Sequence, residues 1–210
     1  MALSAREPSA EASGDIENID GRSARRDRNR TAVLDAVIEL FSEDNLAPGP
    51  EEVALRVGLS ARSVYRYFED RDALVRSAIE RHLEILRPLF AIEEFTRGSF
   101  EERLERFMAS RMGVYEVGAA SFRASVVRSS FDSILKGQLE ANHRAMRHQV
   151  DAQFAIEIDS MASPRRDAVA AAVDALTQFE SIEQYRIHRG LSAEETSVLL
   201  TRALRILLAP

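Results

Sequence analysis

Apolar residues recur along most of the chain at the three- and four-residue spacing of amphipathic helices. From Thr31 they define a first helix that is expected to end near residues 44–45. Two shorter runs follow, at residues 51–57 and 61–68, and a long run opens at residues 69–72. No segment shows the sustained alternation of apolar and polar residues that marks a half-buried strand. The sequence therefore predicts an all-α protein without a sheet.

Residues that begin and end helices surround the two short runs. Pro50 suits the first position of a helix, because its missing N–H would have no partner there. Gly58 suits the left-handed position after a helix, and Ser60 is a good N-cap for the next one. Two short helices joined by about three residues are typical of a helix-turn-helix.

Helical periodicity continues almost to the end of the chain. Pro88 is expected to kink or end the fourth helix, because proline removes a backbone donor and clashes with the preceding turn. Gly118 and Gly137 are among the small residues that are expected to separate the later helices. Those helices are expected at residues 100–117, 122–135, 139–158, 164–188 and 193–208.

Composition excludes several kinds of chemistry. The 210 residues include 45% hydrophobic residues, enough for one sizeable domain or two small ones, and no cysteine. A chain without cysteine has no disulfide, thiol nucleophile or thiolate metal site. No apolar run approaches the ~20 residues that cross a bilayer, and the N-terminus does not resemble a secretion signal. We therefore expect a cytoplasmic protein that does not bind a membrane.

Taken alone, the formal net charge of −6 argues against a nucleic-acid partner, because binding to polyanions depends on Lys and Arg. Most of this charge lies in residues 1–20, where one arginine accompanies five acidic residues. Residues 1–21 are expected to be a disordered acidic tail. Five of the next ten residues are arginines. Such a stretch is often a solvated terminus, but before a DNA-binding motif it can reach the backbone or the minor groove, and the sequence leaves this open for residues 22–30.

The run at residues 61–68 is the second helix of this motif, the one that enters the major groove in a helix-turn-helix. It carries the residue types that bind DNA. Val64 and Phe68 are four residues apart and are expected to face the core, whereas Arg62 and Arg66 share an outer face. An arginine there can contact guanine or phosphate, and serine and tyrosine hydroxyls can bond phosphate oxygens. The predicted DNA-binding residues are Arg30, Ser60, Arg62, Ser63, Tyr65, Arg66, Tyr67 and Arg71.

The same helix could instead be an ordinary bundle face, with its arginines paired to Glu69 and Asp70. A resemblance favours the DNA-binding interpretation. Residues 53–74 resemble the DNA-binding signature of the TetR family of transcriptional regulators: a Val-Ala pair, a Gly-Leu-Ser turn, a Ser-Val-Tyr-Arg-Tyr-Phe recognition helix and a basic residue that opens the fourth helix. Residues 190–195 are similar to the link into the last helix of many members.

Four positions depart from the family pattern. Gly49-Pro50 stands where a Ser/Thr cap and an apolar residue usually open the second helix. Ser63 replaces the usual Thr and loses a methyl group that could touch thymine, and Arg71 replaces the more frequent Lys. Ala61 lacks the polar side chain of many members, which would shift base contacts onto Arg62, Ser63 and Arg66.

The resemblance implies two domains, a helix-turn-helix domain at residues 22–72 and a helical effector-binding and dimerisation domain at residues 73–210. The last two helices of the family form a dimer interface, and the last helix here is apolar around much of its circumference, more than one buried stripe requires. Methionine and aromatic residues of the middle helices suit an adaptable apolar pocket, although each is more often plain core. The candidate ligand-binding residues are Met108, Met112, Tyr115, Phe122, Arg123, Val126, Phe154 and Phe179.

The sequence thus predicts a homodimeric DNA-binding regulator, expected to be a repressor that a small-molecule effector releases from a palindromic operator. The alternative is a helix-bundle adaptor that binds protein through the same surface. An enzyme has little support, because the sequence shows no phosphate-binding loop and no nucleophile with a recognisable base. His143 and His148 are five residues apart, the wrong spacing for one helical face, so neither a metal site nor a cofactor is expected. His82 and His188 are expected to be solvated or capping.

Overall fold

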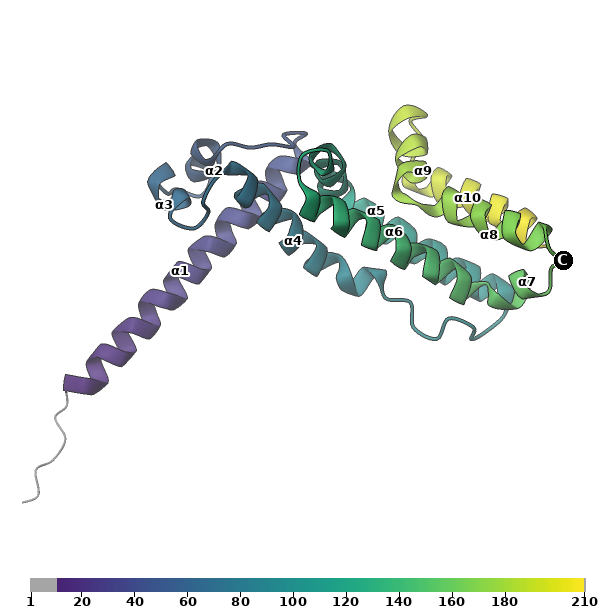
Figure 1. Cartoon of the computed structure of the whole chain (residues 1–210), viewed down its shortest axis with the longest axis horizontal. Helices are drawn as coiled ribbons and strands as arrows, with labels where there is room; N and C mark the ends of the chain where they lie inside the picture. The colour runs from purple at the N-terminus through teal and green to yellow at the C-terminus, as the bar shows by residue number, and fades with distance from the viewer. Residues whose placement is uncertain (1–10, 210) are drawn as a thin grey trace, which may run out of the picture.

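The computed structural model describes residues 11–209, and within that range it contains helices and no strand (Figure 1), which confirms the predicted all-α class. The elements are α1 (Glu11–Ser42), α2 (Pro50–Arg56), α3 (Ala61–Tyr65), α4 (Arg71–Phe90), α5 (Phe100–Ser129), α6 (Ser133–Gln153), α7 (Ala155–Asp159), α8 (Arg165–Thr177), α9 (Phe179–Glu183), the π-helix η1 (Gln184–His188) and α10 (Ala193–Leu208). Figure 1 shows α1 reaching away from the rest of the molecule, with α2 and α3 beside its carboxyl-terminal half.

Helix α1 begins at Glu11, well before the expected start at Thr31. Residues 1–10 of the expected disordered tail lie outside the described residues, whereas residues 11–21 belong to the helix and differ from that expectation. Between Pro8 and Ala47 the sequence has no proline, and it is rich in alanine, glutamate and arginine, which all favour helix. Low hydrophobicity alone was therefore a poor guide to backbone structure in this segment.

Helix α5 runs without a break from Phe100 to Ser129, so the expected division at Gly118 is wrong. A Cβ at position 118 would lie 2.7 Å from Cδ1 of Leu86, which belongs to α4. Glycine at this position therefore permits a close crossing of α4 and α5 instead of ending a helix. Gly137 likewise lies inside α6, and the break between the two helices falls near Asp132, whose side chain accepts the N–H of Ile134 and caps α6.

The later helices follow the sequence in part. The run expected at residues 164–188 is divided at Gln178, where the backbone is extended, into α8, α9 and η1. Pro88 lies within the last turn of α4, which ends two residues later at Phe90. Helix α10 has the expected bounds, and Ser192 and Glu195 form a capping box at its start.

Two apolar clusters make up the core, and α4 contributes to both. The first half of α4, with Leu74 and Ile79, packs with α1, α2 and the end of α3. The second half, with Leu86, packs with α5, α6 and the carboxyl-terminal helices. The first cluster thus extends beyond residue 72, where the first domain was expected to end. Helix α4 therefore packs in both apolar clusters and connects them.

His82 corrects an expectation. It is buried, at 6% exposure, and its Nδ1 lies 2.5 Å from the Oγ of Ser121 on α5. Burial lowers the pKa of His82, because the charged imidazolium would lose its hydration.

In the described part of the chain, no helix is long and apolar enough to cross a membrane.

Candidate nucleic-acid interface

Helices α2 and α3 form the expected helix-turn-helix. Gly58 has a φ of +66°, the left-handed conformation that favours glycine after a helix. The N–H of Leu59 donates to the carbonyl of Ala54 at 2.9 Å and closes the turn. Ser60 then caps α3, because its Oγ accepts the N–H of Ser63 at 3.2 Å. These local interactions fix the direction in which α3 leaves α2.

Helix α3 ends at Tyr65, earlier than the expected run 61–68, and Arg66 is its C-cap. Val64 is buried, and Arg62 and Arg66 are exposed, as the spacing predicted. In the part of the chain that the structure describes, neither guanidinium lies within ion-pair distance of a carboxylate. Arg56 on α2 differs, because it donates to both carboxylate oxygens of Glu43 at 2.6 and 2.8 Å. The charges on the outer face of α3 are therefore free to bind phosphate or a base edge.

The acidic residues after α3 do not neutralise its arginines. Asp70 caps α4, and its Oδ1 accepts the N–H of Ala73 at 2.7 Å. Glu69 is exposed and forms no ion pair among the described residues. The ion pairs that an ordinary bundle face would need are thus missing.

The tyrosine and serine hydroxyls predicted to bond phosphates are partly engaged within the protein. Ser60 Oγ and Ser63 Oγ lie 2.9 Å apart. Tyr65 is 50% exposed, and its hydroxyl donates a long 3.4 Å hydrogen bond to Glu51 on α2. Tyr67 is half-buried and packs edge-on against Phe68. Tyr65 is thus the more exposed of the two tyrosines beside the arginines.

Arg30 and Arg71 lie on the elements that flank α3, and both side chains are exposed. The Arg30 guanidinium lies 5.1 Å from the centre of the Phe68 ring, a cation–π contact that ties α1 to the end of the motif. Arg71 Nε donates to the carbonyl of Pro48 at 3.3 Å, which ties the start of α4 to the loop before α2. The structure thus gathers the predicted DNA-binding residues around the outer side of α2 and α3.

Two features of this surface were not predicted from the sequence. Leu55 on α2 is 84% exposed, an unusual position for leucine. Leu55 is not among the buried residues of α2, which include Val53 and Ala54, and its position on that helix could have predicted the exposure. Arg25, Arg26 and Arg28 also project from the helical extension of α1.

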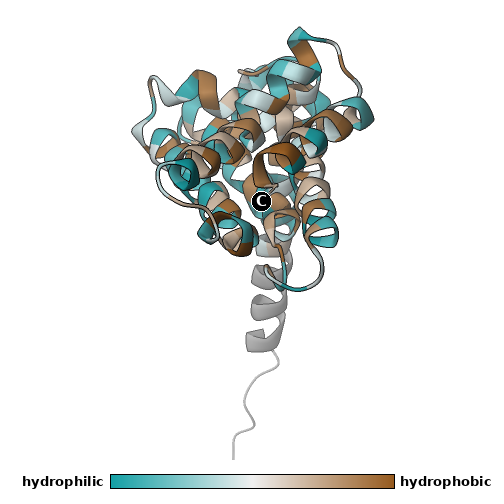
Figure 2. Ribbon diagram, turned by 90° about the vertical axis from the view of Figure 1, so that its right-hand side faces the viewer, coloured by the Kyte–Doolittle hydropathy of each residue, from teal (hydrophilic) through white to brown (hydrophobic). Residues whose placement is uncertain are grey.

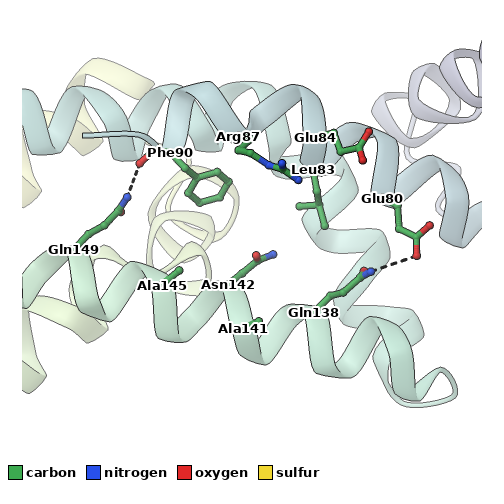
Figure 3. Close-up of a pocket in the computed structure, with 10 residues that line it drawn as sticks. All are labelled: Glu80, Leu83, Glu84, Arg87, Phe90, Gln138, Ala141, Asn142, Ala145 and Gln149. Atoms are coloured by element: carbon green, nitrogen blue, oxygen red, sulfur yellow. Dashed lines mark hydrogen bonds between the residues drawn. The ribbon is translucent and has the colours of Figure 1, made fainter. Parts of the chain in front are cut away.

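The candidate ligand-binding residues do not line one cavity. Most are core residues: Met108, Met112, Tyr115, Phe122, Phe154 and Phe179 are buried. Arg123, Val126 and Phe179 border a groove of about 340 Å³ that also touches Leu46 of the α1–α2 loop. A larger groove of about 530 Å³ runs between α4 and α6 (Figure 3), and it involves none of the candidates. It is lined by Glu80, Leu83, Glu84, Arg87, Phe90, Gln138, Ala141, Asn142, Ala145 and Gln149.

Gln149 connects the larger groove to a buried cation. Its amide donates to the carbonyl of Phe90 and accepts a 2.5 Å hydrogen bond from Nη1 of Arg111. Arg111 is 2% exposed, donates to the carbonyl of Met146 at 2.8 Å and lies over the ring of Phe107. Among the described residues no carboxylate pairs with it. Burial therefore lowers the pKa of Arg111 to about 10, although the negative field of Asp174 opposes this shift.

Arg123 takes part in a polar network below the smaller groove. Its Nη1 donates to Glu183 at 3.2 Å, and its Nη2 lies 3.9 Å from Asp44 at the end of α1. Glu183 also accepts a hydrogen bond from the hydroxyl of Tyr115. Burial and this bond raise the pKa of Tyr115 well above its usual range. Arg123 thus forms a salt bridge with Glu183.

Helix α10 presents apolar side chains on two sides. Leu200, Leu204 and Leu208 are buried in the chain's own core. Leu199 and Ile206 are seven residues apart, two helical turns, and are 36% and 76% exposed. Figure 2 looks onto the end of the molecule where the chain's C-terminus lies and colours hydrophobic segments of the ribbon brown. A second apolar face therefore remains uncovered in the single chain.

These features define an all-helical protein with a basic helix-turn-helix at one end, which is the architecture of a DNA-binding transcriptional regulator. The family model described as "Bacterial regulatory proteins, tetR family" matches residues 33–78. A TetR-family transcriptional regulator from Streptomyces coelicolor has a similar structure, with a TM-score of 0.67 and 21% sequence identity, over 86% of this chain and 80% of that one. No relative was found among curated proteins.

The chain thus carries a DNA-binding domain of the TetR type at residues 33–78, and it is a DNA-binding transcriptional regulator. The match covers the end of α1, all of α2 and α3 and the start of α4, and it includes the exposed Arg62, Arg66 and Arg71. Members of this family are transcriptional regulators and not enzymes, so the adaptor and enzyme alternatives are disfavoured.

Proposed function

We propose that the protein is a repressor that binds a palindromic operator as a homodimer and is released by a small-molecule effector. The observation that carries this proposal is the outer face of α3, where Arg62 and Arg66 are exposed and free of carboxylate partners. Two such helices related by a two-fold axis would contact half-sites about one helical turn apart. Because operator DNA lies in the bacterial cytoplasm, we expect the protein to act there.

The DNA-binding side chains can be tested one at a time. The measurement is the affinity of the purified protein for the DNA upstream of its own gene, by fluorescence anisotropy. Arg66→Ala should lower the affinity by roughly 1–3 kcal/mol, about 5- to 150-fold, if the guanidinium contacts a base edge. Arg97→Ala, an exposed arginine before α5, is the matched control and should leave it unchanged. Equal affinities for the two variants would refute the role of Arg66.

Salt dependence tests the polyanion contact itself. If six to ten phosphates are contacted, affinity should fall by about 10³- to 10⁵-fold between 50 and 200 mM salt. A flat response over that range would contradict binding through arginine–phosphate pairs.

The proposed dimer buries the outer face of α10 against its symmetry mate, with α8 beside it. Leaving Leu199 and Ile206 in water is unfavourable, and burying an aliphatic side chain contributes about 1.5–3 kcal/mol. An isologous interface counts each contact twice. Ile206→Glu should therefore give monomers in analytical ultracentrifugation. Ile156→Glu changes an isoleucine of similar exposure on α7 and is the control, which should stay dimeric.

We propose the groove between α4 and α6 as the effector site, because its volume of about 530 Å³ falls in the range of small-molecule pockets. Its wall on α4 leads directly to the helix-turn-helix. An effector can release DNA only if it binds more tightly to the conformation with misplaced recognition helices.

We also propose a division into two domains, residues 22–72 for DNA binding and residues 73–210 for effector binding and dimerisation. Helix α4 packs with both.

A filled groove provides the test. Ala145→Trp places a large side chain between α4 and α6, and Ala109→Trp, at an exposed position on α5 outside the groove, is the control. A thermal-shift screen of a metabolite library against the wild-type protein identifies stabilising compounds. Such a compound should stabilise the Ala109→Trp protein and release it from DNA, and should do neither for the Ala145→Trp protein. Full retention of both effects in Ala145→Trp would exclude this groove.

A further inference from the structure

Helix α1 continues beyond the helix-turn-helix as a basic rod. Residues 23–30 carry Arg25, Arg26, Arg28 and Arg30 against a single acidic residue, Asp27, and all four arginines are exposed. Within the described residues none of them lies at ion-pair distance from a carboxylate. Figure 1 shows α1 projecting beyond α2 and α3 toward its N-terminal end. The segment is thus a local positive surface on a chain whose net charge is −6.

The direction of this rod is set by the DNA-binding motif. Arg30 stacks over Phe68, the residue that ends the recognition segment, and Val33 and Val37 of α1 are fully buried in the same core. Positions 26, 30, 33 and 37 follow one another at four- and three-residue intervals, so they share one face of the helix. Arg26 therefore lies on the helix face that packs against the motif, about one turn N-terminal to Arg30, which contacts Phe68.

A solvated helix end is a poor explanation for this arrangement. Arg26 and Arg30 are like charges four residues apart, which destabilises an isolated helix by roughly 0.2–0.5 kcal/mol. The described part of the chain supplies neither an apolar contact nor a carboxylate for Arg25, Arg26 and Arg28 that would offset this repulsion. A polyanion placed alongside removes the repulsion and releases counterions.

We propose that residues 23–30 form a second DNA contact, in which Arg25, Arg26 and Arg28 bind the phosphodiester backbone outside the half-site that α3 contacts. At 1.5 Å per residue this segment is about 12 Å long, and over that length a duplex carries about seven charges. The contact adds affinity without sequence preference, because phosphates carry no base information. The inference rests on the DNA binding of the helix-turn-helix, but this second contact also requires duplex DNA beyond the operator core.

The test compares two triple variants with the same change in net charge. Arg25→Gln/Arg26→Gln/Arg28→Gln removes the proposed contact and keeps the helix propensity, because glutamine and arginine are similar helix formers. Lys136→Gln/Arg144→Gln/Arg147→Gln removes three exposed charges from α6 and is the control. Footprinting on the DNA upstream of the gene defines the core, and duplexes with and without ten flanking base pairs on each side are then titrated, together with a 40-base-pair duplex of unrelated sequence.

The expected result is a smaller salt dependence of the α1 variant on flanked and unrelated duplexes. Three lost phosphate contacts lower the slope of log K against log salt by about 2.7 per protomer and about 5.4 for the dimer, so between 50 and 200 mM the wild type loses about 1,800-fold more affinity than the variant. On the trimmed core the two proteins should bind alike, and the α6 control should match the wild type on every duplex. The preference for operator over unrelated DNA should change little.

Other outcomes would overturn the inference. Equal salt slopes of the wild type and the α1 variant on flanked DNA mean that the segment does not touch the backbone. An equal loss in the α6 control means that the effect is only total charge. If Arg66→Ala abolishes binding while the α1 variant is unaffected, the regulator function stands and the second contact fails. Circular dichroism of both triple variants shows whether they remain folded.

Discussion

Gly118 marks a close crossing between α5 and α4, the helix whose first half packs against the helix-turn-helix. A Cβ on this residue would lie 2.7 Å from Cδ1 of Leu86 and 3.2 Å from Cε2 of Phe122. Both side chains are buried, and Leu86 is 0% exposed, so neither has free space to move into. We predict that Gly118→Ala lowers the free energy of unfolding, although alanine is the better helix former.

The magnitude follows from two opposing effects. Replacing a helical glycine by alanine favours folding by roughly 0.5–1 kcal/mol, and overpacking of a filled core costs about 1–3 kcal/mol. Gly113 on α5 and Gly137 on α6 provide matched controls, because a Cβ on either would meet nothing within 4 Å. Gly113→Ala and Gly137→Ala should therefore stabilise the protein by roughly 0.5–1 kcal/mol. The difference between these controls and Gly118→Ala isolates the overpacking cost of about 1–3 kcal/mol.

Urea unfolding followed by circular dichroism measures these differences. All variants are compared at one protein concentration, because the stability of a dimer depends on it. Leu86→Val removes the contacting methyl group, so the double variant Gly118→Ala/Leu86→Val should be more stable than the sum of the single changes predicts. If Gly118→Ala is as stable as Gly113→Ala, the close crossing does not constrain these helices and the reasoning is refuted.

Three further predictions concern individual interactions. Because the folded pKa of buried His82 is lowered, its stabilising contribution is present above about pH 6.5 and is lost as pH falls below it; the free energy of unfolding should thus fall more between about pH 7.5 and pH 5.5 in the wild type than in His82→Gln, and equal losses would contradict the burial. Arg103→Met leaves the largely buried carboxylate of Glu157 without its partner and should cost about 3–5 kcal/mol, most of which Arg103→Met/Glu157→Leu should restore; no restoration in urea melts would show that the pair is not the cause. Gly58→Ala should cost about 1–2 kcal/mol from the left-handed backbone alone, because nothing lies within 4 Å of its Cβ, and an unchanged melting temperature would refute this.

Features decided by neighbouring residues could be predicted from the sequence. The start of α10 follows from the Ser192–Glu195 capping box, and the turn before α3 follows from Gly58 and Ser60. Gly118 could not be interpreted in this way, because its role depends on Leu86, a residue far away in the chain. A glycine that ends a helix and a glycine that admits a neighbouring helix look the same in sequence. Only the packing of α4 on α5 separates the two.

The same distinction, between features set by neighbouring residues and features set by packing, applies to the candidate site. The outer face of α3 was predictable because Arg62 and Arg66 lie opposite the buried Val64 on one short helix. The effector candidates were chosen as methionine and aromatic residues, and residues such as Met108 and Phe154 prove to be core. The same apolar side chains fill a core or line a pocket, and the difference is whether a neighbouring helix leaves space. Sequence periodicity carries no information about that space.

The position of α4 explains why one small groove could control DNA binding. Its first half is packed into the same apolar cluster as Val64 and Phe68, and its second half is clamped against α5 at Gly118. The groove borders α4 from Glu80 to Phe90, on both sides of Leu86, the residue that contacts the Gly118 crossing. In the proposed mechanism, the filled crossing at position 118 would resist a shift of the second half of α4 when a ligand pushes on it. The displacement would then pass to the first half, and with it to the angle at which α3 meets the major groove.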